Sequence, residues 1–276
     1  MIPAMNNLRL LVVLGPVFLL MSCGPLAAVG LVGSTITNAA YHQAERDQRD
    51  HPRNNDAIAL TNLNLGVEYM RAGEYRLAME KLQRARAAKP DYYPTYNALG
   101  LLYQNLGLPD DAEKNFLYAL KLNPDNSSTL NNYGQFLCSQ GKLEEAEKRF
   151  LAAAENPLYQ TPEIPYANIG TCAYKNNDIE KANNYFQKAL ALNPVIPIAL
   201  IHMCEISYNA GDYPAARQYL KRYLSSSKHT PQSLWLGIRI ERELGDKDME
   251  SSYTMLLRNQ YPESEEAKKL QGLAFN

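Results

Sequence analysis

Residues 93–124 read YPTYNALGLLYQNLGLPDDAEKNFLYALKLNP and contain two apolar patterns of helical spacing, separated by a short turn. Gly107 stands between the two patterns, and Pro124 follows the second. Glycine readily adopts the left-handed conformation that ends a helix, and proline is disfavoured inside one. The stretch therefore predicts two consecutive helices, each with one apolar face that must pack against a neighbour.

The same pattern recurs along the chain. A small residue in the first helix returns in steps of 34, 34, 36 and 34 residues, at Gly66, Gly100, Gly134, Gly170 and Cys204. A period of 34 is that of the tetratricopeptide repeat, a helix-turn-helix unit. Residues 93–124 match its signature at Tyr96, Leu99, Gly100, Tyr103, Ala112, Phe116 and Pro124. The apolar stripes are therefore predicted to be packing surfaces rather than a cofactor site.

The repeat predicts an all-α fold, a right-handed superhelix of about six units in residues 58–276. The units begin near residues 59, 93, 127, 163, 197 and 230, and the segment 264–275 is expected to form a capping helix. We expect a left-handed residue at the turn within five of the units, at Gly73, Gly107, Gly141, Asn177 and Gly211.

The N-terminus predicts a targeting signal. Residues 10–21 are apolar, and the segment LMSC ends at Cys23. Twelve apolar residues are too few to span a bilayer but suit a signal peptide. LMSC resembles the lipobox of bacterial lipoprotein precursors, which implies cleavage after residue 22, acylation of Cys23 and, with Gly24 following, an outer-membrane address. An ordinary signal peptide and an uncleaved anchor are the alternatives.

Residues 23–57 are then expected to be a polar tether between the lipid and the repeats. The net charge of −1 gives no electrostatic footprint for nucleic acid. The chain has no catalytic motif, such as a zinc-protease helix, a nucleophile elbow or a phosphate loop. Glu144, Glu145 and Glu147 are expected to form a solvated helix face. We therefore expect no enzyme activity, metal, cofactor or small-molecule substrate.

Several stretches go beyond the general repeat pattern. They are residues 59–75, 131–147, 156–163, 168–186, 233–246 and 261–270. With the lipobox, they resemble the PilF/PilW family of type IV pilus biogenesis lipoproteins, the pilotins. The resemblance implies an outer-membrane lipoprotein that faces the periplasm and assists assembly of the secretin, the ring through which the pilus exits. A general lipid-anchored adaptor, for example one that recruits peptidoglycan enzymes, is the alternative.

A periplasmic address permits disulfide bonds. Cys138 is the twelfth residue of the third unit and Cys172 the tenth of the fourth, so both fall on first helices of neighbouring units. Their placement favours a bridge over two buried free thiols. Cys204 occupies a small-residue position and is expected to be a buried free thiol.

In this family the first helices line a concave surface, which implies a partner groove. At the N-terminal end the corresponding positions are apolar: Leu60, Leu63, Val67 and Met70. In the middle, Asn97, Leu101 and Asn131 make the surface richer in amides. We expect the apolar end to bind a secretin segment. The alternatives are that these side chains belong to the core, or that the tether covers them.

Overall fold

The computed structural model describes residues 52–273, and this part of the chain is entirely helical. The helices are α2 Pro52–Arg71, α3 Tyr75–Ala88, α4 Tyr93–Asn105, α5 Pro109–Leu122, α6 Ser127–Ser139, α7 Leu143–Ala154, α8 Glu163–Lys175, α9 Ile179–Leu192, α10 Pro197–Asn209, α11 Tyr213–Ser226, α12 Pro231–Leu244, α13 Lys247–Gln260 and α14 Glu265–Leu273. None of these helices is both long enough and apolar enough to cross a membrane.

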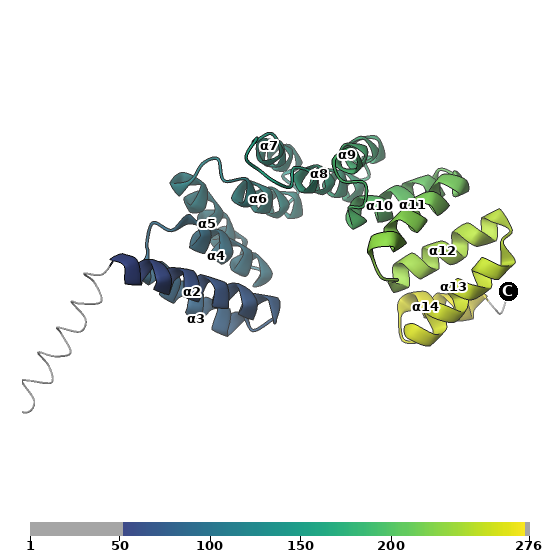
Figure 1. Cartoon of the computed structure of the whole chain (residues 1–276), viewed down its shortest axis with the longest axis horizontal. Helices are drawn as coiled ribbons and strands as arrows, with labels where there is room; N and C mark the ends of the chain where they lie inside the picture. Colours follow the sequence, from purple (N-terminus) through teal and green to yellow (C-terminus); the bar gives the residue numbers. More distant parts are fainter. Residues whose placement is uncertain (1–51, 274–276) are drawn as a thin grey trace, which may run out of the picture. The chain divides into compact units, whose positions relative to one another are not determined.

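Consecutive helices form six pairs, from α2 with α3 to α12 with α13, and α14 packs on the last pair (Figure 1). The first helix of each pair also contacts the first helix of the next. The predicted all-α repeat fold, its six units and its capping helix are therefore confirmed for the described part of the chain. Each pair covers its apolar face with its neighbours, as solenoid repeats do.

Glycine holds the two helices of a pair close together. A β-carbon placed on Gly100 would lie 2.7 Å from the ring of Phe116, which is fully buried in the second helix. Gly134 meets Phe150 and Gly170 meets Phe186 in the same way. A larger side chain at these positions would force the pair apart, because buried rings in a packed core have little room to move.

The turn within each pair needs a left-handed residue. The φ angle is +77° at Gly73, +75° at Gly141 and +62° at Asn177. Asparagine is the residue other than glycine that best tolerates this conformation. All five predicted left-handed turn positions have a positive φ, and Gly245 in the sixth unit adds another.

Helix α2 begins at Pro52, six residues before the predicted boundary at 58. Proline is well placed at the first position of a helix, where its missing N–H costs nothing. Asp56 Oδ1 in this extension lies 2.8 Å from Lys89 Nζ at the end of α3. The polar segment before residue 58 was predicted to be tether because it has no apolar period, but its last six residues belong to the first repeat.

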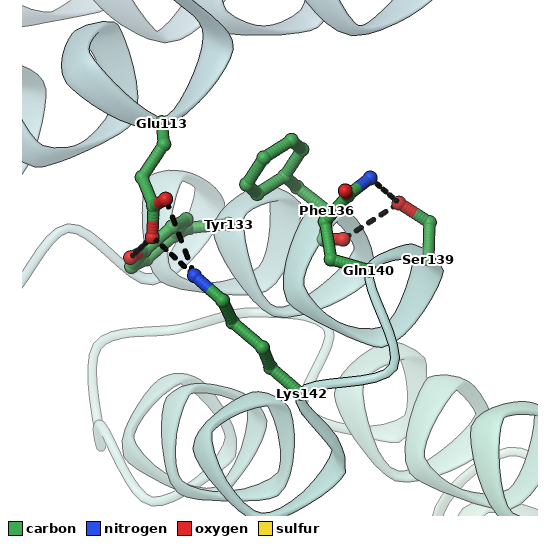
Figure 2. A network of polar contacts seen from close by, with 6 residues as sticks. All are labelled: Glu113, Tyr133, Phe136, Ser139, Gln140 and Lys142. Atoms are coloured by element: carbon green, nitrogen blue, oxygen red, sulfur yellow. Dashed lines mark hydrogen bonds and ion pairs between the residues drawn. The ribbon is translucent and has the colours of Figure 1, made fainter. Parts of the chain in front are cut away.

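Polar contacts connect successive repeats. Figure 2 shows the Glu113 carboxylate of α5 between the Tyr133 hydroxyl of α6 and the Lys142 ammonium at the start of α7. Tyr133 donates a hydrogen bond of 2.8 Å, and this bond, with help from Lys142, lowers the pKa of Glu113. One repeat further on, Tyr185 donates to Glu147 at 2.7 Å. Glu147 is therefore not part of a purely solvated face.

Candidate partner-binding groove

The first helices α4, α6 and α8 lie side by side and form what we call the middle face. Asn132 Nδ2 of α6 donates to Asn97 Oδ1 of α4 at 3.1 Å. Asn168 Nδ2 of α8 donates to Asn131 Oδ1 of α6 at 2.8 Å. Asn131 is only 6% exposed. These two hydrogen bonds between side-chain amides connect three repeats. They define how the first helices align along one another more closely than hydrophobic packing alone would.

A disulfide also joins α6 and α8. Cys138 of α6 and Cys172 of α8 are bonded in the structure, with α-carbons 6.0 Å apart. The bond closes a sequence separation of 34 residues, one full repeat. It lies near the C-terminal ends of α6 and α8, while Asn131 and Asn168 lie nearer their N-terminal ends. The two helices are therefore fixed to each other at two separate levels.

A pocket of about 260 Å³ opens beside this disulfide. Its lining is mostly polar and uncharged: Gln104, Gln135, Ser139, Asn168, Thr171 and Asn176, with Lys175 as the single charged residue. The Oε1 atom of Gln104 is buried and has no hydrogen-bond partner within the described residues. A buried acceptor without a partner is costly, so a donor from a bound molecule would stabilise this site.

The amide lining suits one kind of ligand. Each glutamine or asparagine presents an N–H₂ donor and a carbonyl acceptor. An extended peptide presents the same alternation of N–H and C=O along its backbone. Lys175 adds one positive charge, and no carboxylate of the described residues forms an ion pair with it. The donors and acceptors of the lining therefore suit the backbone of an extended polypeptide segment, and Phe150 adds an apolar surface.

The predicted apolar end of the groove is largely core. Leu63 is 8% exposed and belongs to the cluster formed with Ala78, Leu82 and Leu99. The expectation that Leu63 lines an open surface is wrong, because this leucine packs against α3 and α4. Val67 and Met70 pack against the same cluster, and these two are half-buried. Leu60 is 49% exposed and remains accessible.

The predicted middle residues lie together but differ in exposure. Asn97 and Leu101 are half-buried on α4, and Leu101 packs against the cluster that contains Phe116 and Phe136. Asn131 is buried and bonded, so it supports the face rather than reading a ligand. Sequence reasoning missed Asn132 and Asn168 as their partners. Both stand at the sixth position of their units, one residue after the fifth position expected to face the groove.

Further along the chain, the carboxylate of Glu205 on α10 lies among the first helices α8, α10 and α12. Glu205 Oε1 accepts a hydrogen bond of 2.5 Å from Gln232, and Oε2 lies 3.2 Å from His202 Nδ1. The His202 ring also packs against Tyr174, with centroids 4.7 Å apart. Burial favours the neutral acid, but the bonds from His202 and Gln232 outweigh it and lower the pKa of Glu205. The Glu205 carboxylate therefore already has polar partners within the repeats.

The described residues contain no group of histidine, cysteine and acidic side chains that is suited to a metal ion. Cys204 is a free, buried thiol in that part of the chain, and its Sγ donates to the Ala216 carbonyl at 3.2 Å. Burial raises the pKa of the Cys204 thiol to about 12, so the thiolate is not available as a nucleophile. Cys23 lies outside the described residues.

The six helix pairs define a tetratricopeptide repeat protein. The tetratricopeptide repeat family matches residues 93–126, 115–148 and 168–232. The chain is 31% identical to the type IV pilus assembly protein PilF of Pseudomonas aeruginosa over 247 residues, 89% of this chain and 95% of the relative.

Two solved structures agree with this likeness. One is that of Pseudomonas aeruginosa pilF, with 30% identity, a TM-score of 0.69 and coverage of 79% of this chain and 98% of that one. The other is PilW, described as a widely conserved type IV pilus biogenesis factor, with 30% identity, a TM-score of 0.68 and coverage of 78% and 98%. The chain belongs to the PilF/PilW family of type IV pilus biogenesis proteins.

Proposed function

We propose that this protein is an outer-membrane lipoprotein, anchored through Cys23, that acts as a pilotin for the type IV pilus secretin. It faces the periplasm and binds a secretin segment, so that the secretin reaches the outer membrane and multimerises. The observation that carries the proposal is the family membership across 89% of the chain. The lipobox that ends at Cys23 supports the anchor.

The structure supports a particular mode of binding. The pocket beside the Cys138–Cys172 bond offers amide donors and acceptors on a face held by two asparagine bonds. Side chains fixed in advance lose little conformational entropy when a ligand binds. An extended secretin segment therefore lies along the middle face, with its backbone paired to Gln104 and Gln135. Leu60 adds an apolar contact at the N-terminal end.

The test is a strain that lacks the gene, complemented with variants and scored for heat-resistant secretin multimers and for surface pili. The paired change Gln104→Leu with Gln135→Leu removes the amides at nearly constant size. We expect a loss of secretin multimers while the protein remains helical and membrane-bound. The paired change Gln83→Leu with Gln187→Leu is the control, because these exposed glutamines lie on the second helices α3 and α9.

Full secretin assembly with the Gln104→Leu, Gln135→Leu variant would show that the middle face is not the binding site. Normal multimers and pili in the deletion strain itself would contradict the pilotin role altogether. A defect in cell-wall enzymes without a secretin defect would favour the other candidate, a general lipid-anchored adaptor. The neighbouring genes, whether for pilus components or for peptidoglycan enzymes, separate the same two candidates.

A further inference from the structure

The segments that join one repeat to the next form a continuous border, which we call the inter-repeat edge. It consists of residues 89–92, 123–126, 155–162, 193–196 and 227–230. Hydrogen bonds and an ion pair join each part, or the helix residue next to it, to the preceding repeat: Lys89 with Asp56 of α2, Asn126 with the Tyr93 hydroxyl at the start of α4, Asn156 with the Asp125 carbonyl, Asn193 with Glu163 at the start of α8, and Ser226 at the end of α11 with the Val195 carbonyl.

The chain departs toward Cys23 from this same edge. Helix α2 begins at Pro52, and Asp56 near its start is paired with Lys89 of the first inter-repeat segment. Residues 24–51 separate Cys23 from Pro52, which is 28 residues. Even fully extended, they would reach no further than about 100 Å. The connection to the lipid therefore starts at one edge of the repeats and not at the edge formed by the turns within each pair.

The inter-repeat edge holds an unusual leucine. Leu158 is 87% exposed, more than any other large apolar side chain of the described residues. Its loop is nevertheless fixed, because Asn156 Oδ1 accepts from the Leu158 N–H at 2.9 Å and Asn156 Nδ2 donates to the Asp125 carbonyl at 3.0 Å. The loop therefore holds this side chain outward and does not let it fold back onto the protein.

Two more exposed apolar side chains lie in the edge or next to it: Val195 in the segment 193–196 and Ile164 at the start of α8. Ile164 and Val195 are 37% and 47% exposed, and the bond between Glu163 and Asn193 brings their segments together. Tyr92 lies in the edge and Tyr93 begins α4; both rings are half-buried, and the Tyr93 hydroxyl accepts a hydrogen bond from Asn126. Aliphatic side chains flanked by tyrosines suit the boundary between lipid tails and headgroups.

We propose that the inter-repeat edge rests on the bilayer that holds the Cys23 lipid, with Leu158 inserted among the lipid chains. This orientation rests on the proposed lipid anchor. A lipid surface fits better than a peptide, because the exposed apolar side chains come from separate segments: Leu158 and Val195 lie in two inter-repeat segments and Ile164 lies at the start of α8. The lipid-modified cysteine keeps the protein at the membrane, and contact of the edge with the bilayer fixes the height and orientation at which the middle face meets an incoming secretin.

The experiment measures tryptophan fluorescence in the lipidated mature protein, reconstituted into vesicles of phosphatidylethanolamine and phosphatidylglycerol. The vesicles are prepared with and without lipid that is brominated on its acyl chains, which quenches a nearby tryptophan. Leu158→Trp adds a reporter at the edge, and Leu108→Trp adds one at the turn between α4 and α5. Leu108 is 46% exposed and lies one helix length, about 20 Å, from the inter-repeat edge. The wild type, with Trp235 alone, gives the background.

We expect brominated lipid to reduce the fluorescence added by Leu158→Trp and to leave that added by Leu108→Trp unchanged. Equal quenching of both, or of neither, in vesicle-bound protein overturns the orientation and leaves the anchor intact. Protein that does not bind vesicles at all overturns the anchor as well. A blue shift of Leu158→Trp that already occurs without vesicles shows that protein covers the edge, and this also overturns the proposal.

Discussion

Leu63 in the first repeat and Asn131 in the third occupy the same position of their units, the fifth residue, and are almost equally buried at 8% and 6% exposed. Leu63 packs into an apolar cluster with Leu82 and Leu99. Asn131 instead accepts a hydrogen bond of 2.8 Å from Asn168 of the next repeat. The repeat thus accepts either an aliphatic or an amide side chain at this position, provided that its neighbours satisfy it.

The difference separates residues that support the face from residues that contact a partner. A buried leucine contributes through packing, and a buried amide contributes through a bond that leaves a costly unpaired group when broken. Neither leaves much surface for a ligand. In the proposed binding mode, contact with the partner therefore falls to the more exposed neighbours, Leu60 in the first repeat and Gln135 in the third.

The largest expected effect comes from breaking the middle region at its disulfide. Closing a loop of 34 residues stabilises the fold by about 4 kcal/mol in the loop-entropy model. Cys138→Ala with Cys172→Ala should lower the free energy of unfolding by about this amount, measured with urea. The reduced wild type should match the double variant.

Thiol counting checks the bond itself. Denatured but unreduced mature protein with an acylated Cys23 should show one free thiol, that of Cys204. Three free thiols would mean that the bridge does not form in the cell. The middle would then depend on packing as much as the first repeat does, and the contrast between the two regions would weaken.

The next effect tests the first repeat. Leu63→Ala should lower the free energy of unfolding by about 3 kcal/mol, because it leaves a cavity between α2, α3 and α4. Leu60→Ala is the matched control, three residues earlier on the same helix and 49% exposed, with an expected change within about 0.5 kcal/mol. Similar losses for both leucines would show that the N-terminal apolar residues act as one buried group.

Much of the fold follows from the sequence because the repeat carries several independent signals. The 34-residue spacing, the glycines opposite aromatic rings and the left-handed turn residues each require the same helix pair, so errors at one position do not propagate. The start of α2 did not follow, because Pro52 to Ala57 carry no apolar period. Asp56 in this segment pairs with Lys89, just after α3, and a pattern within α2 alone does not contain this contact.

Less of the candidate site than of the fold could be predicted from the sequence. The sequence placed Asn97 and Asn131 on the middle face but not their partners Asn132 and Asn168, which lie 35 and 37 residues further on. Facing positions depend on the small rotation between repeats, which a linear period does not contain. The burial of Leu63 was missed because the fifth position of each unit was expected to face the groove, whereas it is buried in both the first and the third repeat.

A smaller effect tests the amide bond of the middle. Asn131→Ala removes the acceptor of Asn168 and should cost about 2 kcal/mol of unfolding free energy. Gln135→Ala, an exposed position on the same helix, is the control and should change little. Amide hydrogen exchange should locate the loss in α6 and α8. A uniform increase in exchange across all repeats would contradict a local role for this bond.

The smallest effect concerns pH and the Glu113 contact between the second and third repeats. The hydrogen bond from Tyr133, assisted by Lys142, lowers the pKa of Glu113 below its ordinary value of 4.5. A lowered folded-state pKa stabilises the fold above the unfolded-state pKa, and the stabilisation is lost as the pH falls through the folded-state value. Glu113→Gln should therefore be less stable than wild type by about 1 kcal/mol at neutral pH.

That gap should narrow as the pH falls from about 5 to about 3, because the wild-type carboxylate becomes protonated while the glutamine does not titrate. Urea unfolding at a series of pH values measures the gap directly. Glu144→Gln, exposed on α7, is the control and should follow the wild-type curve at every pH. A constant gap for Glu113→Gln would show that the carboxylate charge does not stabilise this interface. The second and third repeats would then resemble the first, which is held by packing.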